Sequence, residues 1–138
     1  MDSINRVLNE QGREIELAYK KKNGLIYIRQ IGNMIFVSGH GPRDQKTDEV
    51  TKGRIDKDVT REEGDLAARS CTIEELYELK IFLGNLDRVK KVIIAFGLVN
   101  CSKVFNDIDY IMNGFSDTII EVFEERGYHT RIVMGTHN

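Results

Sequence analysis

The chain contains one nearly continuous apolar run, and it lies between two long segments with helical periodicity. The run is VKKVIIAFGLV, at residues 89–99. A strand that is exposed on one face alternates apolar and polar residues, whereas a nearly unbroken apolar run is typical of a strand covered on both faces. The run therefore predicts a central strand in a sheet that carries helices.

The two flanking segments are predicted to be helices at about 61–82 and 107–126. The first follows Thr60-Arg61-Glu62-Glu63, a capping-box pattern in which the threonine hydroxyl and the glutamate carboxylate accept from backbone N–H groups of the first turn. Gly84 and Gly127 are typical stop signals. The expected apolar positions are Leu66, Ile73, Leu76 and Leu83 in the first helix, and Ile108, Ile111, Met112, Phe115, Ile119, Val122 and Phe123 in the second.

The remaining elements are predicted to be short. A helix is expected at about 3–11, followed by strands at 25–31 and 34–38 that are joined through a tight turn at Gly32-Asn33. A polar loop at 43–52 leads to a short strand near 53–55, and a last strand covers 130–134. The order predicts a single α+β domain over residues 1–138, with two long helices on one face of a mixed sheet. The other face of the central strand is also apolar, which predicts self-association.

Composition places the chain among ordinary globular proteins. Its 138 residues are 41% hydrophobic and 30% charged, with a net charge of −2. A protein that holds a phosphate backbone needs clustered basic charge, so nucleic acid is not expected as a partner, and Lys20–Lys22 is interpreted as a solvated turn. Without an apolar run long enough for a membrane span or a signal peptide, a cytoplasmic protein is expected. Cys71 and Cys101 are expected to be reduced and at least partly buried.

Arg131 is the side chain that most needs an explanation, because it lies in an otherwise apolar strand. It is either an anion clamp, whose planar fork of N–H donors matches a carboxylate, or one half of an ordinary ion pair with a glutamate. The histidines His40, His129 and His137 are interpreted as loop residues, and their spacing indicates no metal site. Cys101 shows no adjacent base that would make it a nucleophile.

Several separated blocks resemble the RidA/YjgF family, also labelled endoribonuclease L-PSP. The blocks are GNMIFVSGHGPRD, VTREEGDLAARSC, LGNLDRVKKV, GLVNCSKVF and NGFSDTIIEVFEERGYHTR, between residues 32 and 131. The last block is similar to the branch with an NGxSDxxxExFxExGxHxR signature. The resemblance implies a chorismate-mutase-like fold and a homotrimer, with ligand sites in the clefts between subunits and no cofactor.

The resemblance also implies a chemistry. Family members with a complete site hydrolyse enamines and imines such as 2-aminoacrylate to a 2-keto acid and ammonia. Arg131 matches the arginine that binds the substrate carboxylate, and Ser38 and Gly39 match a segment that lines the same cleft. No catalytic residue is assigned.

Three differences from the family pattern bear on activity. The family continues after this strand with a Leu-Pro turn and a strand that carries a glutamate, which we would expect to pair with residues 130–134, whereas the sequence stops at Asn138. Lys103 and Val133 stand where active members often have asparagine and cysteine. We therefore expect a protein that binds a small carboxylate, with weak or absent deaminase activity. The alternatives are an active enamine/imine deaminase and an endoribonuclease or translation inhibitor.

Overall fold

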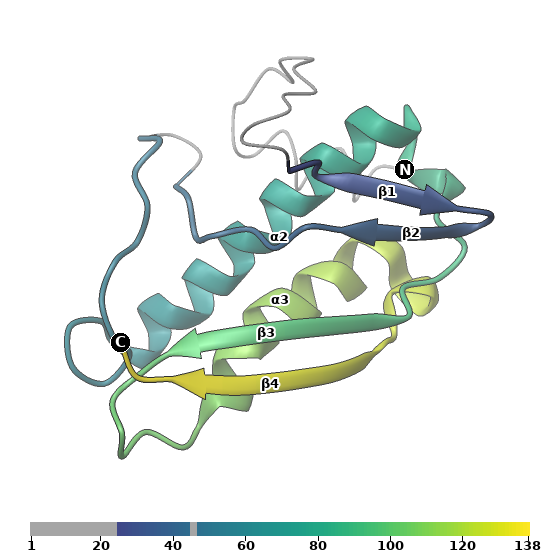
Figure 1. Cartoon of the computed structure of the whole chain (residues 1–138). Helices are drawn as coiled ribbons and strands as arrows, with labels where there is room; N and C mark the ends of the chain where they lie inside the picture. Colours follow the sequence, from purple (N-terminus) through teal and green to yellow (C-terminus); the bar gives the residue numbers. More distant parts are fainter. Residues whose placement is uncertain (1–24, 45–46) are drawn as a thin grey trace.

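The computed structural model describes residues 25–44 and 47–138. The predicted helix at 3–11 and the three lysines at 20–22 lie outside these residues. Figure 1 shows the described elements. They are β1 (Ile28–Ile31), β2 (Met34–Val37), α2 (Arg61–Leu83), the 3₁₀ turn η1 (Leu86–Arg88), β3 (Ile94–Asn100), α3 (Ile108–Phe123), the 3₁₀ turn η2 (Glu124–Gly127) and β4 (Thr130–Thr136).

The strands form two pairs on the same side of the helices, so the predicted α+β layout is confirmed (Figure 1). The hairpin β1–β2 is antiparallel, and it turns at Gly32, whose φ of 57° is a conformation that glycine adopts easily. Strands β3 and β4 are parallel neighbours joined by the α3 crossover. Among the described residues the two pairs are separate two-stranded sheets rather than one continuous sheet.

Helix α2 begins and ends as its local signals predict. The Thr60 hydroxyl accepts from the Glu63 N–H at 3.1 Å, and the Glu63 carboxylate accepts from the Thr60 N–H at 2.8 Å. Gly84 is the C-terminal cap. The predicted apolar face is wrong at Leu66, which is 62% exposed. The face that packs against α3 begins at the small buried residue Gly64 and continues through Thr72 and Ile73.

The core lies between the two helices and the inner side of the strands. Its main cluster is Ile73, Leu76, Tyr77, Leu86, Ile119, Val122 and Phe123. Large side chains buried this completely each contribute about 1.5–3 kcal/mol to stability. The periodic pattern of α3 is confirmed, although this helix ends at Phe123 and continues as a 3₁₀ turn to Gly127.

Strand β3 differs from the prediction in length and in burial. It begins at Ile94 rather than at residue 89, and only one of its faces is covered. Ala95, Gly97 and Val99 are buried beneath the helices, whereas the alternating residues are not. The exposed large apolar side chains of β3 and β4 form what we call the outer face, and each is 49–62% exposed. They are Ile94, Phe96, Leu98, Ile132 and Met134.

The predicted strand near 53–55 is reduced to isolated bridges from Ile55 to Val59 and to Cys101. Strand β4 extends to Thr136, beyond its predicted end. None of the described helices has the length and hydropathy that crossing a membrane requires.

Candidate functional site

Arg131 lies near the start of β4, and its guanidinium group turns toward helix α3. Nη1 donates to Asn113 Oδ1 at 3.0 Å and to Ser116 Oγ at 3.2 Å. Nη2 donates to Asp109 Oδ1 at 3.0 Å. The arginine side chain is 23% exposed, so the guanidinium is held by the protein and still reaches water. The structure thus contains an ion pair, and the guanidinium is oriented as a clamp would require.

Ser116 connects Arg131 to His129 in a chain of hydrogen bonds whose directions are consistent. His129 Nδ1 lies 2.6 Å from the Gly127 carbonyl oxygen, which can only accept, so this nitrogen carries the proton. In a neutral imidazole with this tautomer, His129 Nε2 accepts from the Ser116 hydroxyl at 3.0 Å. The Ser116 oxygen is left to accept from Arg131. Each polar group has one role, which holds the arginine in place.

Sequence analysis assigned no role in the site to Asp109, Asn113, Ser116 or His129, although a signal for such a role exists. The first three recur at i, i+4 and i+7, which places them on one side of α3. His129 and Arg131 are two residues apart, so they lie on one face of an extended segment. The polar side of α3 and the polar pair His129 and Arg131 could therefore have been predicted to face each other.

Ser38 and Gly39 do not join Arg131 within one copy of the chain. They follow the C-terminal end of β2, whereas Arg131 is near the N-terminal end of β4. The arrows of β2, β3 and β4 point the same way in Figure 1, and the tip of β2 lies level with the first part of β3 and β4. No hydrogen bond joins Ser38 to Arg131 among the described residues. The Ser38 hydroxyl donates to the Ile26 carbonyl oxygen at 2.8 Å. A Cβ at Gly39 would meet no atom within 4 Å, so nothing in the described chain approaches it closely.

The histidines lie outside helices and strands, as predicted. His137 Nδ1 is 3.1 Å from the Cys101 carbonyl oxygen. His40 stacks on Tyr27, its side chain is 10% exposed, and its Nε2 is buried without a partner among the described residues. His40 lies beside Ser38 and Glu75, whereas His129 lies beside Ser116 and Gly127, so the two histidines do not pair with each other in one copy.

Glu75 on α2 is a partly buried acid beside His40. Its carboxylate lies 3.9 Å from His40 Nδ1, and its side chain is 27% exposed. Burial disfavours the charged form and raises the pKa of Glu75 to about 7. The pKa of Glu75 is higher in the folded protein than in the unfolded chain. The protonated carboxyl of Glu75 therefore stabilises the fold fully below the pKa of the unfolded chain, and this stabilisation is lost as pH rises through about 7.

Glu75→Gln is therefore expected to stabilise the protein at alkaline pH and to change little at acidic pH. Glutamine has the same shape and does not ionise. The gain should approach about 3 kcal/mol when urea unfolding is compared at about pH 8.5 and about pH 5. Glu124→Gln, at an exposed glutamate, is the control for loss of one carboxylate. An equal effect of Glu75→Gln at both pH values would contradict the burial argument.

The two cysteines are free, and they are buried as predicted, Cys101 fully and Cys71 in part. Burial raises the pKa of Cys71 to about 12, and the nearby Glu75 adds to this shift. Burial also raises the pKa of Cys101. Because the thiolate is the nucleophilic form, neither cysteine is suited to covalent chemistry at neutral pH.

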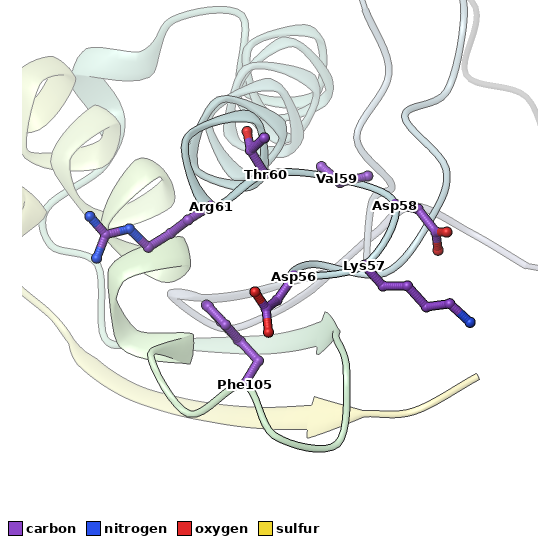
Figure 2. Close-up of a pocket in the computed structure, with 7 residues that line it drawn as sticks. All are labelled: Asp56, Lys57, Asp58, Val59, Thr60, Arg61 and Phe105. Carbon is purple, nitrogen blue, oxygen red and sulfur yellow. The ribbon is translucent and has the colours of Figure 1, made fainter.

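Figure 2 shows a pocket of about 380 Å³ between the start of α2 and the loop before α3. Most of its polar groups already have partners within the chain. Arg61 is 2.9 Å from Asp107 and covers the Tyr110 ring, while Asp58 accepts from the Arg54 N–H. The pocket therefore lacks groups that converge on a ligand. The described residues also contain no cluster of histidine, cysteine or acidic side chains that could hold a metal ion.

Comparisons with known proteins identify relatives in sequence and in structure. Over 105 residues the chain is 38% identical to Protein TCP17 of Trypanosoma cruzi, covering 75% of this chain and 65% of that protein. The chain thus spans less than two thirds of that relative. The fold matches the structure of Atu1372, a protein with unknown function from Agrobacterium tumefaciens, with a TM-score of 0.84 and 27% identity over 98% of this chain and 82% of the other.

A second solved structure agrees with the first. It is described as a "putative endoribonuclease" from Shewanella oneidensis MR-1 and matches with a TM-score of 0.83 and 26% identity, covering 96% of this chain and 87% of the other. The family model described as "YjgF/chorismate_mutase-like, putative endoribonuclease" matches residues 13–137. The motifs, the fold and this match over most of the chain lead to one conclusion: the protein belongs to the YjgF/chorismate mutase-like family.

Proposed function

We propose that this protein binds a small carboxylate-bearing metabolite through Arg131. The observation that carries the proposal is the guanidinium itself, which is partly exposed and is oriented by Asn113 and Ser116. An arginine held in this way is well suited to a carboxylate, because little conformational entropy remains to be lost on binding. Saturable binding of 2-oxobutanoate in a calorimetric titration would support this role. Titration heats no larger than those of diluting the ligand into buffer would contradict it.

The binding cleft is proposed to form between copies of the chain, in a homotrimer. Two observations support this arrangement. The Ser38 hydroxyl is bonded to the Ile26 carbonyl oxygen and not to Arg131, and a Cβ at Gly39 would meet no atom within 4 Å, which leaves room beside this segment for a second copy. The outer face is a contiguous apolar area on neighbouring strands, since Phe96 pairs with Ile132 and Leu98 with Met134 in register.

Phe96→Asp is expected to convert the trimer to monomers. The substitution puts a charge in the middle of the outer face, where association would remove it from water without a partner. Sedimentation equilibrium measures the change in mass. Val104→Asp is the matched control, because Val104 is an equally apolar and more exposed residue in the turn after β3, away from the outer face. A trimer that survives Phe96→Asp would contradict the proposed interface.

Deaminase activity is proposed to be weak or absent. Hydrolysis of an imine needs a group that activates water or moves a proton. Among the described residues the acid that contacts Arg131 is Asp109, and its carboxylate is paired with the guanidinium. The test generates 2-aminoacrylate enzymatically and measures pyruvate and ammonia with and without the protein. Release at the uncatalysed rate by a protein that binds 2-oxobutanoate is the expected result, and strong acceleration would establish the deaminase alternative.

The endoribonuclease role named for the family and for one structural relative is the less supported alternative. The net charge of −2 opposes binding to a phosphate backbone. His40 and His129 do not form an acid–base pair within one copy. Salt-dependent binding of single-stranded RNA would favour this role over the proposed one.

A further inference from the structure

We propose that Asp109 is an internal competitor for the carboxylate site of Arg131, and that it makes the site select ligands with a single carboxylate. The inference rests on the proposed function, because it concerns how Arg131 receives a ligand. It goes further by naming the residue that the ligand must displace and the charge that the ligand can carry.

The contacts of Arg131 divide into a fixed side and an exchangeable side. Nη1 is held by the neutral oxygens of Asn113 and Ser116, and Ser116 is buried and bonded onward to His129. Nη2 is held at 3.0 Å by the carboxylate of Asp109, whose side chain is 77% exposed at the first turn of α3, and it makes only a long contact of 3.5 Å with the Asp109 carbonyl oxygen. An incoming anion can therefore reach the Nη2 side without disturbing the network behind Nη1.

A carboxylate binds a guanidinium best through two parallel N–H donors. The pair Nε and Nη2 offers this geometry, and the Nε–H has no hydrogen-bond partner within the described part of the chain. Asp109 occupies Nη2, so it blocks half of the two-point contact. A ligand carboxylate that takes both donors must move the Asp109 carboxylate aside.

The strength of the Asp109 contact decides whether displacement is feasible. An ion pair with one partner this exposed is weak, and breaking it lowers the affinity of a competing carboxylate by about fivefold at most. An incoming carboxylate can therefore displace the Asp109 carboxylate from Arg131. Once displaced, Asp109 stays tethered to α3 and keeps its negative charge close to the ligand. A ligand with a second carboxylate is repelled more strongly than one with a single charge.

The experiment compares 2-oxobutanoate, with one carboxylate, and 2-oxoglutarate, with two, in calorimetric titrations of the full chain and of Asp109→Asn. The variant is expected to bind 2-oxobutanoate about fivefold more tightly. Its affinity for 2-oxoglutarate should rise by a larger factor, so the preference for the monocarboxylate narrows. Unchanged or weaker binding of both ligands in Asp109→Asn would overturn the inference.

Asp107→Asn is the matched control. It makes the same acid-to-amide change two residues earlier, where the carboxylate contacts Arg61 at 2.9 Å and not Arg131. If it raises affinity as much as Asp109→Asn does, the effect is one of overall charge and the inference is overturned.

A second readout does not depend on ligand affinity. Phenylglyoxal modifies accessible arginines, and peptide mass mapping gives the rate at Arg131. Asp109→Asn should speed this modification several-fold, whereas Asp107→Asn should leave it unchanged. An unchanged rate at Arg131 in Asp109→Asn would contradict the inference that Asp109 blocks access to this arginine.

Binding that persists in Arg131→Ala would overturn the proposed function together with this inference. Binding that needs Arg131 but ignores Asp109 would overturn the inference alone.

Discussion

Arg131→Ala is expected to weaken binding of 2-oxobutanoate at least about 100-fold, because two charge-assisted hydrogen bonds of about 1.5–3 kcal/mol each are lost. The protein should remain folded. Asp109 and Asn113 become free of the arginine at positions where water can solvate them, and Ser116 keeps its hydrogen bond to His129. The measurement is calorimetric titration of the variant together with its unfolding free energy in urea.

Arg61→Ala is the matched control for this substitution. Arg61 also pairs with an aspartate at the start of α3, but this aspartate is Asp107 and not the Asp109 that contacts Arg131. It should leave ligand binding unchanged. If Arg131→Ala and Arg61→Ala have the same effect on binding, the assignment of the carboxylate to Arg131 is wrong. Arg131→Lys should recover only part of the affinity, since an ammonium group cannot make the two-point contact.

Gly114→Ala is expected to lower the free energy of unfolding by about 3 kcal/mol or more, within the range measured for overpacked cores. Gly114 is where α3 passes closest to α2, and an added Cβ would lie 2.0 Å from the Asp65 carbonyl oxygen. The clashing atom belongs to the backbone, so a change of side-chain rotamer cannot relieve the clash. The two helices must therefore move apart. The better helix propensity of alanine offsets only about 1 kcal/mol.

Gly39→Ala is the control for Gly114→Ala, because a Cβ there meets no atom within 4 Å. It should change the unfolding free energy by less than about 0.5 kcal/mol. Urea unfolding at neutral pH measures both variants. A fully stable Gly114→Ala protein would mean that the two helices do not cross as closely as the structure shows.

Prediction from sequence succeeded for features that depend on neighbours along the chain. The capping box at Thr60, the stop at Gly84 and the turn at Gly32 were all found, because each is a contact within a few residues. Prediction was weaker where the same sequence pattern is compatible with both a buried and a solvent-exposed side chain. The apolar run at 89–99 was expected to be covered on both faces, yet in one copy of the chain Ile94, Phe96 and Leu98 are exposed.

Apolar periodicity cannot distinguish a side chain that is buried within one copy from one that is buried only by contact with a second copy. The same ambiguity affected Arg131. Its position in an apolar strand was visible in the sequence, and so was its match to a family arginine. Which of the many acids would lie beside it depends on how far α3 is shifted along β4, and no local pattern specifies that shift.

The sequence by itself determined the order of the elements, the helix that crosses from β3 to β4, and the arginine at the start of β4. These follow from periodicity, caps and motif blocks, which are local in the chain. Only the tertiary structure decided that Asp109, Asn113 and Ser116 surround that arginine. Those contacts arise from the packing of α3 against β4, which brings together residues that are 15 to 22 positions apart in sequence.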